Sequence, residues 1–90
     1  MIIEHPFSVL PDVDLVILGK SSTIYDRYAD QIRREYAQYS DSEFAAGRCD
    51  ALGWFRGRER IYRNPWFSSK YEAAAHDNLD REHDKWIKLI

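Results

Sequence analysis

The chain has little cysteine and no hydrophobic run long enough to cross a bilayer. Its one cysteine, Cys49, cannot form a disulfide within the chain, and we interpret it as a buried or half-buried thiol in a reducing compartment. A nucleophilic cysteine needs a base arranged by the fold, and the sequence places none. No apolar stretch approaches the ~20 residues of a transmembrane helix. These absences argue against a disulfide scaffold and against a membrane-spanning protein.

The chain also lacks an excess of charge of one sign. Thirteen Lys and Arg residues stand against fifteen Asp and Glu residues, which gives a formal net charge of −2. A general nucleic-acid binder is usually strongly basic, so nucleic acid is not expected as a partner. The first residues, Met1 to Pro6, have neither the basic region nor the long apolar region of a signal peptide. We therefore expect a cytoplasmic protein.

What is present is a globular composition rich in aromatic side chains. Ninety residues make one domain, and we expect a single helical domain over 1–90 with residues 1–11 as an extended lead-in. The hydrophobic fraction is 44% and the aromatic fraction is 14%. The aromatic rings supply bulk to a thin core, and buried Tyr and Trp need polar partners.

The first half of the chain predicts one short helix and one longer helix. Residues 12–19, DVDLVILG, form an apolar run opened by acids and closed by glycine, which favours one or two helical turns. Ser21 is a suitable N-cap for a helix over 22–39. In that segment Tyr, Ala and Ile recur at spacings of three and four, which is typical of one buried helical face.

The second half predicts two further long helices. The segment from Ser40 to Glu43 is a capping box that opens the third helix. Three glycines in it indicate either close packing against a neighbour or a break near Gly57. Asn64 and Pro65 then start a fourth helix that reaches to about residue 89. Its apolar stripe is expected at Phe67, Tyr71, Ala74, Ala75, Asn78, Leu79, Glu82 and Trp86. The expected fold is all-α: a compact bundle of one short and three longer helices.

Five segments, in order and spacing, resemble a bacterial branch of HD-superfamily metal-dependent phosphohydrolases. Residues 12–19 are similar to its D-A-D-L-x-I-L-G segment, and residues 32–36, IRREY, to its I-R-x-E-Y helix. Phe44 with residues 46–48 resembles its F-x-x-G-R helix start. The remaining likeness lies in Ile61-Tyr62 with Pro65-Trp66-Phe67, and in Glu72-Ala73-Ala74-Ala75 with Asn78-Leu79. The resemblance covers about residues 10–82 and implies the C-terminal part of an HD-domain fold.

The resemblance implies a divalent metal held by a His, a His-Asp pair and a distant Asp. Carried over, Asp14 is the better candidate for the distant ligand and Asp12 the second. Such a metal lowers the pKa of a bound water that attacks phosphorus. Both acids also have a structural interpretation, as favourable charges at a helix N-terminus.

The chain departs from that family in its metal ligands. The family's His and His-Asp pair lie upstream of the D-A-D segment, in helices that would precede Met1, and they are absent from this sequence. One carboxylate does not hold a catalytic metal, because hydrolytic zinc sites use about three protein ligands. We therefore expect no catalytic activity and no bound metal for this chain alone. A nucleotide or phosphoester substrate is expected only for a complete domain.

Two other groups of residues are weaker candidates. Arg56, Arg58 and Arg60 are possible phosphate contacts, or else a solvated face that pairs with the acidic last helix. His76 and His83 each precede an Asp and, with Asp80, share one helical face that suits a weak transition-metal site. The alternative for this face is a solvated helix surface.

Two functional hypotheses follow. The first is an incomplete, C-terminal part of an HD-type phosphohydrolase, inactive without its upstream half. The second is a small helical module for protein interaction or self-association. The apolar run from Leu15 to Leu18 is expected to be incompletely covered, so we predict a homodimer or a missing N-terminal half as the partner.

Overall fold

The computed structural model describes residues 10–90, and these residues form four helices. A 3₁₀ helix, η2 (Asp12–Gly19), is followed by α1 (Ser22–Glu35), α2 (Asp41–Arg56) and α3 (Pro65–Ile87). No strand occurs in this part of the chain, which confirms the all-α fold with one short and three longer helices. Most of the expected lead-in, residues 1–9, lies outside the described residues, and Pro11 is extended with φ −72° and ψ 158°.

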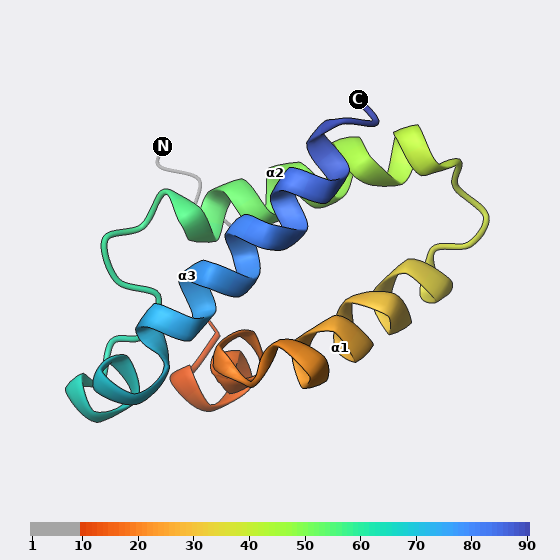
Figure 1. The fold of residues 1–90 in the computed structure, drawn as a ribbon. Helices are drawn as coiled ribbons and strands as arrows, with labels where there is room; N and C mark the ends of the chain where they lie inside the picture. The colour runs from red at the N-terminus through yellow and green to blue at the C-terminus, as the bar shows by residue number, and fades with distance from the viewer. Residues whose placement is uncertain (1–9) are drawn as a thin grey trace.

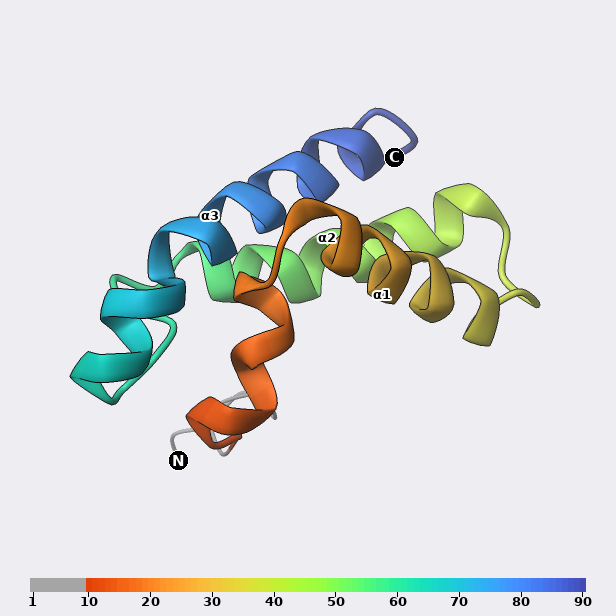
Figure 2. The same cartoon turned by 60° about the horizontal axis from the view of Figure 1, so that its bottom comes forward.

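The helix α3 is the central element of the fold. It runs antiparallel to α2 and packs along it, and it also packs against η2 (Figure 1). The helix α1 leaves η2 and contacts α3 less extensively, and it diverges from α2 along its length (Figure 2). The principal extents are 40 × 38 × 21 Å, so the molecule is about two helix diameters thick. None of the described helices combines the length and the apolar character that a bilayer crossing requires.

The helix starts follow the local capping chemistry that the sequence predicts. The Ser21 hydroxyl accepts a hydrogen bond from the Ile24 amide at 3.4 Å, and the Asn64 side chain accepts one from the Trp66 amide at 2.8 Å. The reciprocal capping box is formed, because the Ser40 hydroxyl accepts from the Glu43 amide while the Glu43 carboxylate accepts from the Ser40 amide. Each contact satisfies a backbone group that a helix end leaves without a partner.

The end of α1 differs from the sequence prediction. The helix stops at Glu35 rather than at residue 39. The Arg33 guanidinium donates to the carbonyl oxygens of Tyr36 and Tyr39, each at 2.9 Å, and pairs with Asp41 at 2.9 Å. These bonds satisfy the carbonyls of a tight turn and join it to α2. The helical spacing of apolar residues in the sequence continues to Tyr39, but Arg33 holds residues 36–39 in this turn, so the helix ends earlier than that spacing predicts.

The glycines of α2 resolve one of the alternatives left open by the sequence. The helix ends at Arg56 with Gly57 as its C-cap, so the break near Gly57 is confirmed. An added Cβ at Gly47 or Gly53 would meet no atom within 4 Å, so neither glycine marks a close helix contact. Tyr62 lies in the loop that follows α2, and it is fully buried.

Two carboxylates hold the loop 57–64 in place. The Glu72 carboxylate accepts hydrogen bonds from the amides of Ile61 and Tyr62 at 2.8 and 3.3 Å. The Asp12 carboxylate accepts from the amides of Arg63 and Asn64 at 2.9 and 2.6 Å. The loop is therefore fixed to α3 on one side and to η2 on the other, which brings Ile61 and Tyr62 into the core.

The apolar run of η2 is covered only in part. Leu15 and Leu18 are buried, with 7% and 4% of their surface exposed, and Val16 and Ile17 are half-buried. The Tyr62 hydroxyl donates to the Leu15 carbonyl at 2.8 Å, and the Asn78 amide donates to the Leu18 carbonyl at 2.8 Å. Leu15 and Leu18 therefore belong to the core, whereas Val16 and Ile17 remain partly exposed.

Gly19 is the position where backbone and side chain approach most closely. A Cβ built there would lie 2.6 Å from the Tyr71 Cβ, 2.8 Å from the Tyr71 carbonyl oxygen and 3.0 Å from the Tyr62 hydroxyl. The Tyr71 Cβ and carbonyl oxygen are fixed by the backbone of α3 and cannot move aside. For this reason η2 and α3 can pack in this way only if residue 19 has no side chain.

We predict that Gly19→Ala destabilises the fold by about 1–3 kcal/mol, because the new methyl group forces η2 away from α3. Gly47→Ala is the matched control: its Cβ is unobstructed, so it should stabilise the helix by about 0.5–1 kcal/mol. Chemical denaturation followed by circular dichroism measures both. Equal stability of wild type and Gly19→Ala would show that η2 does not sit as described.

Candidate functional site

An apolar groove lies between α1 and α2, where the two helices diverge. Its volume is about 590 Å³, within the range of ligand and peptide sites in proteins. Leu15 and Leu18 of η2 and Leu79 of α3 also line it. The complete lining is Leu10, Asp14, Leu15, Ile17, Leu18, Tyr28, Ile32, Glu35, Tyr36, Tyr39, Glu43, Phe44, Gly47, Arg48, Ala51, Leu52, Phe55 and Leu79.

Two of the α2 residues that line this groove have a small side chain or none. Gly47 and Ala51 are one helical turn apart and both line the groove. Gly47 is exposed, and a Cβ there would point into open space. Small side chains let a second helix or segment approach the α2 backbone closely, so the α2 wall of the groove is open along this turn.

Three exposed carboxylates line the groove, and its one cation is neutralised. The acids are Asp14, Glu35 and Glu43. The hydrogen bond from the Ser40 backbone holds the pKa of Glu43 below its usual value, so this group is anionic at neutral pH. Arg48 is paired with Glu82 at 2.7 Å and adds no net charge. The groove is therefore apolar along its length and negative at its edges.

The two acids of the DVD segment have different surroundings. Asp12 accepts two backbone hydrogen bonds from the loop before α3, so both of its oxygens are engaged. Asp14 is exposed and lines the groove, and within residues 10–90 its carboxylate accepts no hydrogen bond. The structural interpretation holds for Asp12, although it fixes the approach to α3 rather than the start of its own helix. Asp14 is the carboxylate that remains accessible.

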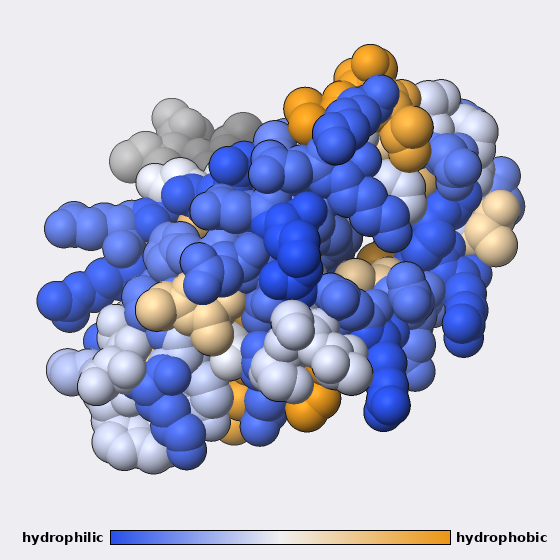
Figure 3. Space-filling model, in the orientation of Figure 1, coloured by the Kyte–Doolittle hydropathy of each residue, from blue (hydrophilic) through white to orange (hydrophobic). Residues whose placement is uncertain are grey.

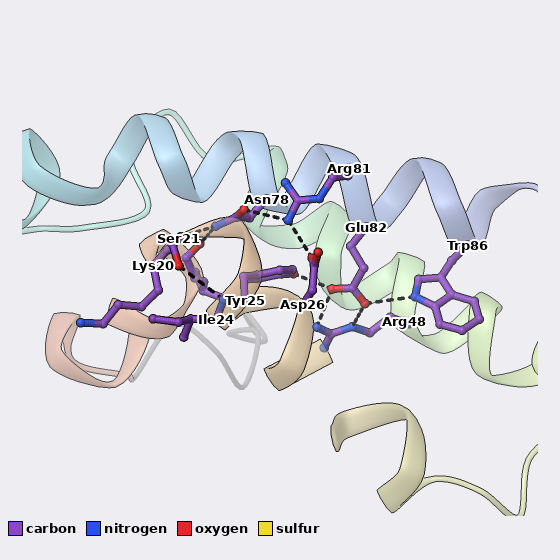
Figure 4. A network of polar contacts seen from close by, with 11 residues as sticks. Lys20, Ser21, Ile24, Tyr25, Asp26, Arg48, Asn78, Arg81, Glu82 and Trp86 are labelled. Atoms are coloured by element: carbon purple, nitrogen blue, oxygen red, sulfur yellow. Dashed lines mark hydrogen bonds and ion pairs between the residues drawn. The ribbon is translucent and has the colours of Figure 1, made fainter. Parts of the chain in front are cut away.

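A buried carboxylate, Glu82, lies behind the groove and connects α1, α2 and α3 (Figure 4). Arg48 donates to it twice, at 2.7 and 2.9 Å. The Tyr25 hydroxyl donates to Oε1, and the Trp86 indole donates to Oε2 at 3.1 Å. Within the described chain, every fully buried polar side-chain atom has a hydrogen-bond partner.

These partners keep Glu82 ionised despite its burial. Burial by itself raises the pKa of a carboxyl group, but the Arg48 guanidinium and the Tyr25 and Trp86 donors outweigh it, so the pKa of Glu82 lies below its usual value. The same burial and the Glu82 charge raise the pKa of Tyr25, which stays protonated as the donor. The Arg48–Glu82 contact is a structural ion pair, because both side chains are largely buried and, of the two, only Arg48 lines the groove.

Cys49 fits the structural interpretation made from the sequence. It is buried, with 7% of its surface exposed, and burial raises the pKa of its thiol. The thiolate, which is the nucleophilic form, is therefore disfavoured.

The arginines following Cys49 are largely engaged within the chain. Arg56 pairs with Asp80 of α3 at 2.7 Å, as the solvated-face alternative predicted. Arg58 lies over the Trp54 ring at 4.7 Å and donates to the Arg60 carbonyl at 3.2 Å. None of Arg56, Arg58 and Arg60 lines the groove, so the structure does not bring the possible phosphate contacts to Asp14.

The histidines of α3 do not gather with other ligands. His76 contacts the Glu72 carboxylate one turn earlier, at 2.9 Å. Within residues 10–90, no group of three or more His, Cys, Asp and Glu side chains is arranged to hold a metal ion, and this includes the proposed set of His76, Asp80 and His83.

Sequence reasoning did not identify the Arg48–Glu82 pair or the groove. One signal was available: Glu82 occupies a position on the apolar stripe of α3, where a charge needs a buried partner. The identity of that partner depends on how α2 docks, which no local pattern shows. Comparison with known proteins found no matching family model, no matching curated protein and no matching solved structure.

We predict that Glu82→Gln lowers the stability of the fold by about 3–5 kcal/mol, because it leaves the Arg48 cation buried without its counter-ion. Asp80→Asn is the matched control on the same helix. It breaks the exposed pair with Arg56 and should cost at most about 1 kcal/mol. Urea denaturation at neutral pH measures both, and equal losses would contradict the role assigned to Glu82.

The pH dependence of stability gives a second check on Glu82. Its pKa in the folded chain is below the ordinary 4.5, so its contribution is complete above that pH and is lost as the pH falls through the folded value. Between neutral pH and the acid range, Glu82→Gln should show a shallower loss of stability than wild type below about pH 4.5. Parallel curves for the two proteins would refute this assignment.

Proposed function

We propose that this chain is the C-terminal part of an HD-type metal-dependent phosphohydrolase, which becomes active when a segment carrying the His and His-Asp ligands occupies the groove. The observation that supports it most is the position of Asp14. Its carboxylate is exposed beside an apolar groove and accepts no hydrogen bond within the described residues. Of the two acids that the family resemblance selects, it is the one that a metal on an incoming segment can reach.

The described residues do not by themselves fit a divalent metal. The oxygens of Asp12 are engaged with the loop amides, and no three ligating side chains gather anywhere in residues 10–90. A catalytic metal needs about three protein ligands, so Asp14 contributes at most one of them. A metal-dependent reaction step therefore does not follow from this part of the chain. What the chain offers is an acidic ligand position and a surface for the segment that completes it.

The lining supports the docking part of this proposal. Tyr28 and Ile32 of α1 face Phe44, Leu52 and Phe55 of α2 across the groove. Burying one aliphatic or aromatic side chain between such walls contributes about 1.5–3 kcal/mol. A helical segment with a few apolar residues would thus bind firmly and would exclude water beside Asp14.

A second candidate function is docking without chemistry. It is favoured by the same groove together with the structural engagement of Asp12, because one of the two family acids already has a role in the fold. In this case the chain is a helical interaction module, and Asp14 is only one of the acids beside its binding surface.

The DNA upstream of the Met1 codon tests the first proposal directly. We expect an in-frame or adjacent coding segment with a His and a later His-Asp pair. Co-expressed with this chain, that segment should give manganese-dependent hydrolysis of a simple phosphomonoester, while this chain alone gives none above background. Turnover by this chain alone, or the absence of any such segment near it, would refute the proposal and leave the docking module.

The two acids provide matched variants for that complex. Asp14→Asn should weaken manganese binding by roughly tenfold or more, since it removes a ligand whose loss costs at least about 1.4 kcal/mol. Asp12→Asn should lower the melting temperature, because the loop amides lose their charged acceptor, and should leave manganese affinity within about twofold. Isothermal titration and thermal melts separate these outcomes. The reverse pattern would assign the ligand to Asp12.

A further inference from the structure

The C-terminal end of α3 carries an aliphatic cluster that is exposed among the described residues. Ile87, Leu89 and Ile90 are 46%, 44% and 66% exposed. They lie where Figure 3 shows the largest apolar area of this face, at the end of α3. Exposed aliphatic side chains that cluster in this way mark interaction surfaces. We call these three residues the C-terminal cluster.

The C-terminal cluster and the groove have complementary properties. The cluster is apolar and flanked by the exposed Lys85 and Lys88, with no acid after Asp84. The groove is apolar and flanked by Asp14, Glu35 and Glu43, while its Arg48 is neutralised by Glu82. Apolar surface matched with opposite charge at the edges is the usual pattern of a specific contact.

The cluster also lies at one end of the groove. Trp86 packs edge-on against Phe44 with ring centroids 4.9 Å apart, and Phe44 lines the groove. The end of α3 is accordingly next to the start of α2 in both views (Figures 1 and 2). A twofold axis near this corner would place the cluster of each copy over the groove of the other. Such a contact closes on itself, as most homodimer contacts do.

We infer that the groove of one chain receives the C-terminal cluster of a second copy, and that the chain forms a reciprocal homodimer in this way. The contact buries Ile87, Leu89 and Ile90 against the α1 and α2 walls, with Lys88 near the acidic edge. This inference does not depend on the proposed phosphohydrolase function. Self-association would nevertheless occupy the same groove and so compete with a segment that completes a metal site.

Two groups of variants separate the two halves of the contact. Gly47→Leu places a large side chain in the groove. It should not harm folding, because a Cβ at this position meets no atom within 4 Å. Gly53→Leu is its control, since this glycine of the same helix is equally unobstructed but does not line the groove. On the other side, Leu89→Ser with Ile90→Ser removes the apolar part of the cluster.

Sedimentation equilibrium on the whole chain tests the inference. Wild type and Gly53→Leu should be dimeric at roughly 100 μM, and Gly47→Leu and the double-serine variant should each weaken the dimer at least tenfold, which is about 1.4 kcal/mol. Lys88→Glu should weaken it as well, and added salt should reduce the difference between Lys88→Glu and wild type.

A mixing experiment is the sharpest test. A homodimer of either variant lacks both contacts and should be weak, but Gly47→Leu keeps its cluster and the double-serine variant keeps its groove. An equimolar mixture should therefore form a heterodimer with one of the two contacts restored. Two outcomes overturn the inference: a wild type that stays monomeric at that concentration, or a dimer whose mass the Gly47→Leu substitution leaves unchanged.

Discussion

The buried carboxylate of Glu82 is the contact on which the arrangement of the three long helices depends. It receives hydrogen bonds from Tyr25 of α1, Arg48 of α2 and Trp86 of its own helix, α3. An unpaired charge at this depth would destabilise the fold by several kcal/mol, so the three donors must arrive together. The ion pair thus favours one relative position of the helices over other packings of a small and largely aromatic core.

The groove is a consequence of this arrangement. Both α1 and α2 are attached to α3 through Glu82, but they diverge beyond that point and leave Tyr28 and Ile32 facing Leu52 and Phe55. A domain of 90 residues is too small to cover all of its apolar faces, because small domains bury a smaller fraction of their surface on folding than large ones do. With a thickness of only 21 Å, residues 10–90 provide no further layer to close the space.

The sequence predicts the features that depend on near neighbours. The Ser40–Glu43 capping box, the Ser21 cap and the Asn64-Pro65 start are all formed, because each needs only residues within one turn. The stripe of α3 was also predictable from its period, including the buried Asn78 and Glu82. The end of α1 was not, because Arg33 stops the helix through bonds to a turn and to α2.

The candidate site was predictable only in part, for the same reason. A resemblance selected Asp12 and Asp14, but their surroundings depend on a loop fifty residues away and on the angle between two helices. The groove has no sequence signature, because its walls are ordinary apolar helix faces against which no other described helix packs. The glycines of α2 indicated helix packing or a break, whereas Gly47 in fact lines the groove with open space beside it.

The different surroundings of the two acids follow from the helix that carries them. In a 3₁₀ helix, residues three apart lie directly above one another. Asp12 is therefore in one row with Leu15 and Leu18, two of the buried residues of η2, and its carboxylate meets the loop amides. Asp14 is in another row, with Ile17, and both of these residues line the groove together with Leu15 and Leu18. Although the two acids are only two residues apart, Asp12 is engaged in hydrogen bonds that hold the fold together, whereas Asp14 is exposed and available for chemistry or binding.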